Sequence, residues 1–158
     1  TKMLGEQVCL KNDPNSIIIR TSWLYSSFGN NFVKTMCASM KLNESLSIIS
    51  DQMGSPTYAA DLAKALLIII DKKKWHPGIY HYSNEGETNW YEFACIINKL
   101  YGFNSEINEI SSFEYFAKTK RPSYSILDKT KIKETFKLKI PHYKDSLTKC
   151  IKLIKNEG

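Results

Sequence analysis

Short runs of β-branched residues alternate along this chain with longer runs of helical periodicity, and this alternation limits the possible folds more than any other feature. It predicts a strand that opens the segment 16–25 and ends before Trp23, and further strands at 45–50, 78–83 and 105–110. It predicts helices at 1–12, 31–41, 58–71, 88–100, 129–136 and 143–155, with an irregular segment at 119–128. Strands that alternate with helices are typical of an α/β layer rather than a β-sandwich. We therefore predict an α/β fold.

Three of the predicted helices have an apolar stripe that we expect to be buried. The stripes consist of Val33, Met36, Cys37 and Met40, of Leu62, Ala63, Leu66, Ile69 and Ile70, and of Trp90, Phe93, Ala94, Ile97 and Tyr101. We expect N-caps at Asn30 or Asn31, at Thr57 and at Thr88, because their side chains can accept bonds from free helix amides. Gly102 is expected to end the third helix.

A polar corner, "SDQMGSPT" at 50–57, stands directly before the second of these helices. Gly54 permits a backbone shape that other residues resist. Pro56 moves Ser55 out of helical geometry. The polar side chains of Asp51 and Gln52 then project from a rigid corner. By itself, this pattern equally fits a plain connection between a strand and a helix.

Composition indicates an ordinary globular protein of 158 residues with a net charge of +6. The basic excess fits a solvated basic face, an anionic small ligand or nucleic acid. Its four cysteines have no metal-site spacing, and its three histidines are scattered, so we expect buried free thiols and no metal. Free thiols suit a reducing cytoplasm. No apolar run approaches the ~20 residues of a membrane helix, so no membrane partner is expected.

Four stretches together resemble the carboxyl-terminal half of the dTDP-4-dehydrorhamnose reductases, which belong to the extended short-chain dehydrogenase/reductase superfamily. They are "RTSWLYSSFGNNFVKTM" (20–36), "SDQMGSPTYAADLA" (50–63), "GIYHYSNEGETNWYEFA" (78–94) and "RPSYSILD" (121–128). The resemblance covers residues 1 to about 128. It implies the carboxyl-terminal part of an NAD(P)-binding Rossmann-like fold, with the substrate-binding subdomain.

The opening "TKMLGEQ" resembles the end of the family's Tyr-x-x-x-Lys helix, with Lys2 as its lysine. The tyrosine would precede Thr1, and no Gly-rich phosphate loop occurs in the chain. We therefore expect residues 1–158 to be the substrate-binding portion with the last Rossmann elements, and the amino-terminal cofactor-binding half to be absent. The sheet edge left open should drive homodimer formation or require rearranged strands.

The resemblance implies that the intact protein reduces a dTDP-4-keto-6-deoxysugar with NADPH or NADH. Lys2 would then lower the pKa of the missing tyrosine and hydrogen-bond the cofactor ribose. Its alternative is an exposed helix lysine. Trp23 would form a flat wall for the sugar or the nicotinamide, and otherwise belongs to the core. Arg121 would bind the diphosphate, and otherwise makes a surface ion pair.

Four further residues complete the implied substrate site. Asn31 and Phe32 match the family's Asn-Phe at a helix start, which suits a pyrophosphate; their alternative is a capping box and a core anchor. Gln52 would bond the sugar or base, while Asp51 would orient neighbouring donors or close the turn. Tyr124 would stack or donate near the nucleotide.

Other functions stay open at this point. An epimerase or dehydratase of the same superfamily would share the tyrosine–lysine pair. A reductase-like regulatory subunit would bind without catalysis. A nucleic-acid-binding module has no supporting signature, so no nucleic-acid partner is expected. As a fragment, the chain should be inactive alone.

Overall fold

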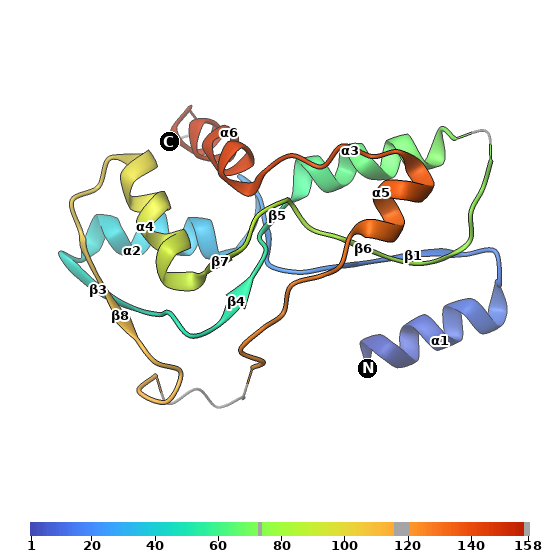
Figure 1. Cartoon of the computed structure of the whole chain (residues 1–158). Helices are drawn as coiled ribbons and strands as arrows, with labels where there is room; N and C mark the ends of the chain where they lie inside the picture. The colour runs from blue at the N-terminus through green and yellow to red at the C-terminus, as the bar shows by residue number, and fades with distance from the viewer. Residues whose placement is uncertain (73, 116–120, 157–158) are drawn as a thin grey trace.

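A computed structural model describes residues 1–72, 74–115 and 121–156. Two lobes are joined at the middle of the molecule (Figure 1). The β1–β6 lobe contains α1 (Lys2–Asn12), β1 (Ile17–Thr21), α3 (Ala59–Ile70), β6 (Gly78–Tyr82) and α5 (Thr130–Phe136). The β3–β8 lobe contains α2 (Phe32–Leu42), β3 (Ser45–Ile49), α4 (Trp90–Tyr101), β8 (Glu106–Ile110) and α6 (Tyr143–Asn156).

The β1–β6 lobe is a layered α/β unit. Its strands β1 and β6 are parallel, with Ile17 opposite Gly78 and Thr21 opposite Tyr82. Helices α3 and α5 lie on one face of this pair and α1 on the other (Figure 1). The first face carries a hydrophobic core formed by Ala65, Ile69, Tyr80, Tyr82, Ile132, Phe136 and Leu138. Helix α1, in contrast, has no buried residue.

The β3–β8 lobe has a separate and larger core. Strands β3 and β8 are parallel, and α4 packs against both of them and against α2 and α6. The buried residues of this core are Tyr25, Val33, Met36, Cys37, Met40, Tyr58, Phe93, Ala94, Ile97, Tyr143, Leu147, Cys150 and Ile151.

Four very short strands connect the two lobes. Strand β2 (Leu24–Tyr25) pairs in parallel with β5 (Thr57–Tyr58). Strand β4 (Met53–Gly54) pairs antiparallel with β7 (Thr88–Asn89). The polar corner at 50–57 is therefore hydrogen-bonded to two other segments, β2 and β7.

The predicted helix faces are confirmed for α2, and for α4 at its centre. Val33, Met36, Cys37 and Met40 are all buried, and so are Phe93, Ala94 and Ile97. Trp90 and Tyr101, at the two ends of α4, are half-buried.

The predicted buried face of α3 is wrong. Among its predicted members only Ile69 is buried; Leu62 is half-buried, and Ala63, Leu66 and Ile70 are exposed. The buried stripe is instead Asp61, Ala65 and Ile69. Asp61 accepts hydrogen bonds from Asn84 and Ser146, and this buried polar network turns the helix about its axis.

Two predicted caps are also wrong. Thr57 does not cap α3, because its hydroxyl is the partner of the Thr21 hydroxyl at 3.0 Å. The amide of Tyr58 donates instead to Asn84 Oδ1 at 2.8 Å. Helix α4 is capped by Asn89 rather than Thr88, since Asn89 Oδ1 accepts from the Glu92 amide at 2.7 Å.

Two other helix ends are confirmed. Asn31 is the N-cap of α2, with its side chain accepting from the Lys34 amide at 3.3 Å. Gly102 ends α4 with φ at +88°, a left-handed conformation that favours glycine.

All four cysteines are free thiols, as predicted. Cys37 and Cys150 are buried, Cys95 is half-buried, and Cys9 is exposed. Over the described ranges, each helix is too short or too polar to cross a bilayer.

Candidate functional site

Trp23 follows the strand that opens the segment 16–25, as the sequence predicts. Strand β1 ends at Thr21 and β2 begins at Leu24, because Trp23 has φ at +47°. A left-handed residue cannot continue an extended strand. The Trp23 carbonyl accepts a hydrogen bond from the Thr57 amide at 3.1 Å, which holds this turn against the polar corner.

Trp23 belongs to a chain of aromatic rings in contact. Its indole lies on that of Trp90 with 3.5 Å between ring centroids and 11° between planes. Trp90 in turn contacts Phe32 at 4.5 Å, and Phe32 stacks on Phe93 at 5.9 Å. Because Phe93 is in the core and Trp23 is only half-buried, the chain runs from the core to the surface. It offers a flat apolar wall there.

Gly54 makes room for that wall. A Cβ atom on Gly54 would lie 2.5 Å from Trp23 Cε2 and 2.5 Å from Cζ2. Its backbone, however, does not have a positive φ. The expectation that Gly54 supplies an unusual backbone shape is therefore wrong, and the glycine is required by the close approach of the indole.

Asp51 and Gln52 both hold Ser112, which follows β8. The Asp51 carboxylate accepts from the Ser112 hydroxyl and, at 2.9 Å, from its amide. These bonds hold the pKa of Asp51 below its usual value. Gln52 is buried and donates from Nε2 to the Ser112 hydroxyl at 2.9 Å. Asp51 thus ties the corner to the segment after β8, and Gln52 commits one amide hydrogen to the same scaffold.

Residues 123–125 lie beside the corner as an added strand-like segment. The Met53 amide donates to the Ser123 carbonyl at 2.7 Å, and the Ser125 amide donates to the Met53 carbonyl at 3.0 Å. This pairing leaves Tyr124 62% exposed. Arg121 is also exposed. Residues 119 and 120 of the predicted irregular segment lie outside the described residues. From Arg121 the chain runs along the gap between the lobes toward α5 (Figure 1).

The side chain of Asn31 is used within its own loop. Besides capping α2, it donates from Nδ2 to the Ser26 carbonyl at 2.8 Å and to the Phe28 carbonyl at 3.2 Å. Phe32 packs between Trp90 and Phe93. These contacts agree with the structural alternatives for both residues, a helix cap and a core anchor.

Lys2 lies apart from the other predicted site residues, at the start of α1 in the β1–β6 lobe. Its side chain is exposed. One turn later, Glu6 forms a two-point ion pair with Arg20 of β1, at 2.9 and 2.6 Å. The hydrogen bond from Arg20 holds the pKa of Glu6 below its usual value. This pair fixes the helix face that carries Lys2 relative to the sheet.

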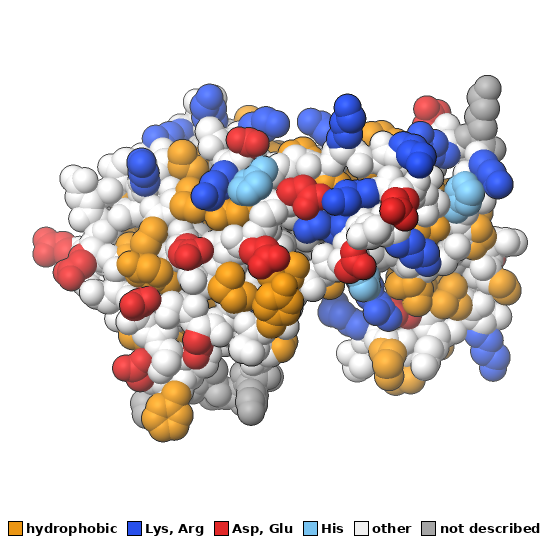
Figure 2. All heavy atoms as spheres, in the orientation of Figure 1, with side chains coloured by type: hydrophobic (Ala, Val, Ile, Leu, Met, Phe, Trp, Pro, Cys, Tyr) orange, Lys and Arg blue, Asp and Glu red, His pale blue; other side chains and the backbone are white. Residues whose placement is uncertain are grey.

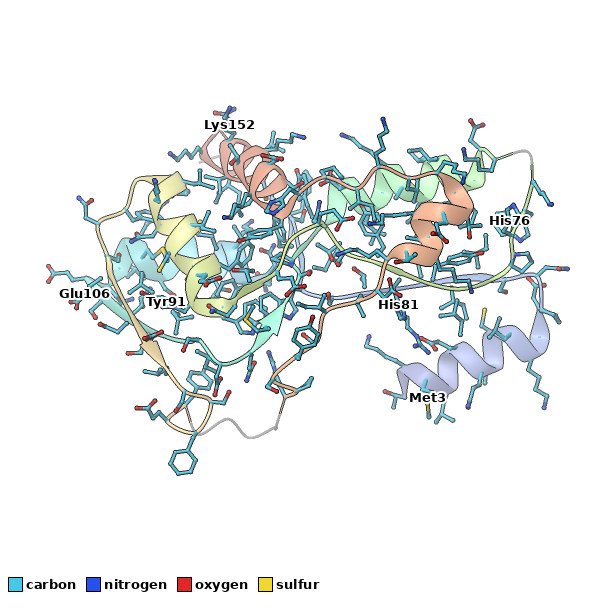
Figure 3. The ribbon with its side chains drawn as sticks, viewed as in Figure 1. Met3, His76, His81, Tyr91, Glu106 and Lys152 are labelled. Atoms are coloured by element: carbon cyan, nitrogen blue, oxygen red, sulfur yellow. The ribbon has the colours of Figure 1, made fainter. Side chains whose placement is uncertain are left out.

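A hollow separates the lobes along the lower edge of the molecule (Figure 2). His81 of β6 and Met3 of α1 lie on the β1–β6 side of the gap (Figure 3). The structure therefore gathers Trp23, Phe32, Gln52 and Tyr124 around one corner of the β3–β8 lobe, and it places Lys2 in the other lobe. A ligand with a flat or ring-shaped part and polar groups suits this corner.

The sequence alone did not assign Trp90 to the site, since its helical spacing indicated only a core face. The one local signal was a large aromatic directly after the Asn89 cap, next to a polar loop. Its contact with Trp23 is non-local, and no pattern along the chain predicts it.

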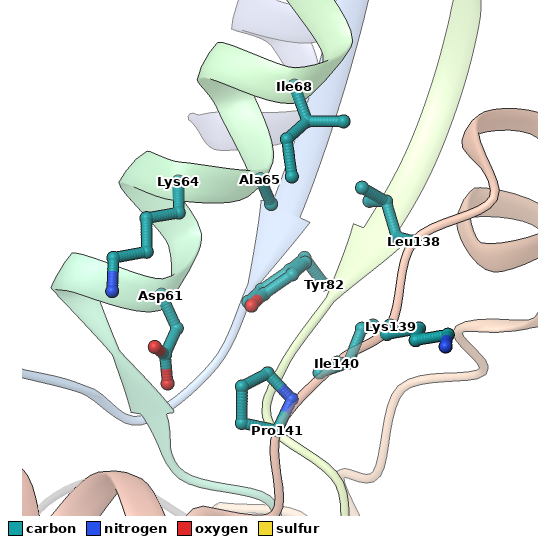
Figure 4. A pocket seen from close by; sticks show the side chains of 9 residues that line it. All are labelled: Asp61, Lys64, Ala65, Ile68, Tyr82, Leu138, Lys139, Ile140 and Pro141. Atoms are coloured by element: carbon teal, nitrogen blue, oxygen red, sulfur yellow. The ribbon is translucent and has the colours of Figure 1, made fainter.

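A cavity of about 150 Å³ lies between α3 and residues 138–141 (Figure 4). Asp61, Tyr82 and Pro141 are among its lining residues, and none of the predicted site residues is. Behind it, the fully buried Asn84 donates to Asp61, to Ser146 and to the Pro141 carbonyl at 2.8–3.1 Å. This network joins α3, the loop after β6 and α6, and it has a structural role.

Residues 1–156 match the family model described as the RmlD substrate binding domain. The chain belongs to this family. The predicted resemblance to dTDP-4-dehydrorhamnose reductases is therefore confirmed at the level of the family.

Curated relatives agree with this assignment. The chain is 41% identical over 147 residues to the spore coat polysaccharide biosynthesis protein SpsK of Bacillus subtilis (strain 168), covering 93% of the chain and 50% of that protein. It is 39% identical over 146 residues to the dTDP-4-dehydrorhamnose reductase of Aggregatibacter actinomycetemcomitans, covering 86% of the chain and 50% of the enzyme. The chain spans about half the length of these relatives.

Solved structures confirm the predicted fold class. The dTDP-4-dehydrorhamnose reductase of Bacillus anthracis, solved with NADP, matches with a TM-score of 0.88 and 36% identity, over 96% of this chain and 53% of that one. The Clostridium acetobutylicum enzyme matches with a TM-score of 0.90 and 35% identity, over 98% and 54%. A UDP-glucuronic acid 4-epimerase of Bacillus cereus, at 18% identity and a TM-score of 0.80 over 99% and 52%, shares the fold alone.

Proposed function

We propose that residues 1–158 are the substrate-binding portion of a dTDP-4-dehydrorhamnose reductase. The whole protein would reduce dTDP-4-dehydro-L-rhamnose to dTDP-L-rhamnose with a nicotinamide cofactor. The family match over residues 1–156 and the names of the relatives support this proposal. The observation that carries it is the half-buried aromatic wall at Trp23, set beside Gln52 and the segment around Tyr124.

Each residue at this corner suits one part of a sugar nucleotide. The indole of Trp23 would pack against the apolar face of the deoxysugar. Arg121 is exposed, and its guanidinium would bind the diphosphate through charge-assisted hydrogen bonds. Tyr124, 62% exposed, would stack on or donate to the nucleotide. Gln52 would use its remaining amide atoms for the sugar or the base.

Asn31 and Phe32 would act from behind this surface. The start of α2, which Asn31 caps, would present a positive helix end toward the diphosphate. Phe32 would support the stacked rings under the sugar.

Lys2 fits the nicotinamide cofactor that the family implies. Its ammonium group is exposed and lies one turn from the Glu6–Arg20 pair that orients α1. There it would donate hydrogen bonds to a ribose hydroxyl and favour the ionised form of a neighbouring phenol. When bound, the cofactor supplies the hydride. NADP in the Bacillus anthracis structure supports a cofactor of this class.

Calorimetric titration with dTDP-L-rhamnose tests the proposal, on this chain and on the full-length protein that contains it. We expect the full-length protein to bind the sugar nucleotide and to oxidise NADPH when given dTDP-4-dehydro-L-rhamnose. Trp23→Ala and Arg121→Ala should each weaken sugar-nucleotide binding by about tenfold. This chain alone should not turn over NADPH.

Two results would contradict the proposal. The first is a full-length protein that binds no dTDP-sugar. The second is epimerisation or dehydration of a sugar nucleotide without net consumption of NADPH, which would indicate a different enzyme of the same superfamily.

A further inference from the structure

We infer that Trp90 is a positioning residue for the Trp23 indole, which it holds in one orientation as a preformed wall for the sugar nucleotide. The inference rests on the proposed function, because it assigns the ligand-contacting role to Trp23. It adds a residue whose action is indirect, through another side chain.

Trp90 is itself held by rigid elements. It is the first residue of α4, directly after the Asn89 cap. Asn89 also pairs with Met53 in the β4–β7 ladder, so the start of α4 is tied to the polar corner. Phe32, 4.5 Å away, supports the Trp90 ring from α2. Trp90 is therefore a fixed platform.

Trp23 depends on that platform. Its backbone has φ at +47°, an unfavourable conformation for a bulky residue that persists only where the surroundings enforce it. The contacts that enforce it are the stack on Trp90 at 3.5 Å and the close approach of Gly54 to the indole. Without the Trp90 ring, the indole would lose the surface that fixes its plane.

The stack also determines which face of Trp23 is available. Trp90 covers one face of the indole at a nearly parallel angle of 11°. Within the described residues, the indole has no second ring partner, and Trp23 is only half-buried. The remaining exposed surface is thus presented at a fixed angle, and the ligand does not have to order it.

A double-mutant cycle on the full-length protein tests this coupling, with titration of dTDP-L-rhamnose as the readout. Trp90→Ala should weaken binding by about tenfold, and Trp90→Phe, which keeps a flat ring, by less than about threefold. In a Trp23→Ala background, Trp90→Ala should have less than about a twofold further effect. A merely structural role would instead give the same loss in both backgrounds.

Circular dichroism in the near ultraviolet gives an independent reading of the stack. The chain has three tryptophans, and Trp75 is a matched control because its Nε1 donates to the Asn15 carbonyl, outside the ring stack. Trp23→Ala and Trp90→Ala should remove the same tryptophan signal, which Trp75→Phe should leave. Trp90→Leu, which keeps apolar volume without a flat face, replaces Trp90→Ala if the latter does not fold.

The outcomes separate the inference from the proposed function. If the wild type binds dTDP-L-rhamnose and Trp90→Ala (or Leu) binds it equally well, the inference is overturned and the proposed function is intact. The same holds if the losses from the Trp23 and Trp90 substitutions are additive. A wild-type protein that binds no dTDP-sugar overturns the function and, with it, the inference.

Discussion

The indole of Trp23 occupies the space that a side chain on Gly54 would need, since a Cβ there would come within 2.5 Å of the ring. Tryptophan and glycine are therefore a matched pair across the polar corner. This relationship explains why a glycine stands in "DQMGSPT" at a position whose backbone φ is not positive.

We predict that Gly54→Ala lowers the free energy of unfolding by about 1–3 kcal/mol, because the new methyl group forces the indole or the β4 backbone to move. In a Trp23→Ala background the same substitution should cost much less. Urea denaturation of the four proteins measures the coupling. Gly5→Ala is the control: it is in α1 with no atom within 4 Å of the added Cβ, and it should stabilise the helix slightly. An equal cost of Gly54→Ala in both backgrounds would show that the steric explanation is wrong.

Asn84→Ala should destabilise the protein by about 3 kcal/mol. The fully buried Asn84 accepts from the Tyr58 amide and donates to Asp61, both at 2.8 Å, so its loss removes two buried hydrogen bonds. Chemical denaturation checks the value against Asn108→Ala. Asn108 is exposed and donates to Ser45 Oγ at 3.0 Å, so this control should change stability by less than about 0.5 kcal/mol. Similar small effects of both substitutions would contradict the view that the hydrogen bonds of Asn84 stabilise the fold.

Glu85 should make stability fall at acid pH. Burial raises its pKa, but the hydrogen bond from Lys133 and the charges of Lys129 and Lys133 outweigh burial and hold the pKa below the usual 4.5. Because the folded-state pKa is lowered, the stabilisation is present above about pH 4.5 and is lost as pH falls through the folded-state value. Glu85→Gln should therefore be less stable than wild type at pH 7 and nearly equal near pH 3. Urea titrations across this range test it, with the exposed neighbour substitution Glu87→Gln as control. Parallel stability curves for wild type and Glu85→Gln would contradict it.

Glu6→Gln should loosen helix α1. The helix buries no residue, so the ion pair between Glu6 and Arg20 is its main polar tie to the sheet. We expect faster amide hydrogen exchange in residues 2–12 of the variant and unchanged exchange in α4, measured by mass spectrometry. Gln7→Ala, on the exposed side of the same turn, is the control. Unchanged protection of α1 in Glu6→Gln would mean that other contacts orient Lys2.

This chain alone should self-associate through β1. The strand has β6 as its neighbour on one side in a two-stranded sheet, and its other edge carries free backbone groups in the described residues. Sedimentation should thus depend on protein concentration, and Ile18→Lys should reduce the association. Leu67→Lys tests the alternative that the copies associate through exposed apolar side chains of α3, among which Leu67 is 67% exposed. A monomer at all concentrations, or a response to Leu67→Lys only, would contradict edge pairing.

The amino-acid sequence by itself determined the features that depend on neighbouring residues. The alternation of elements, the buried stripes of α2 and α4, the Asn31 cap and the stop at Gly102 all follow from local periodicity and backbone preference. The family resemblance also came from short contiguous motifs, and the family match confirms it.

Only the tertiary structure decided the features that join distant segments. Asn84, from the loop after β6, accepts from the Tyr58 amide at the start of α3, and its bond to Asp61 turns that helix away from its most hydrophobic face. Trp90 stacks on Trp23, and the absence of a side chain on Gly54 leaves room for the Trp23 ring. Whether a polar group is buried, or two rings come into contact, depends on which segments meet in space. The free energies of these non-local contacts outweigh the local preferences on which a prediction from sequence rests.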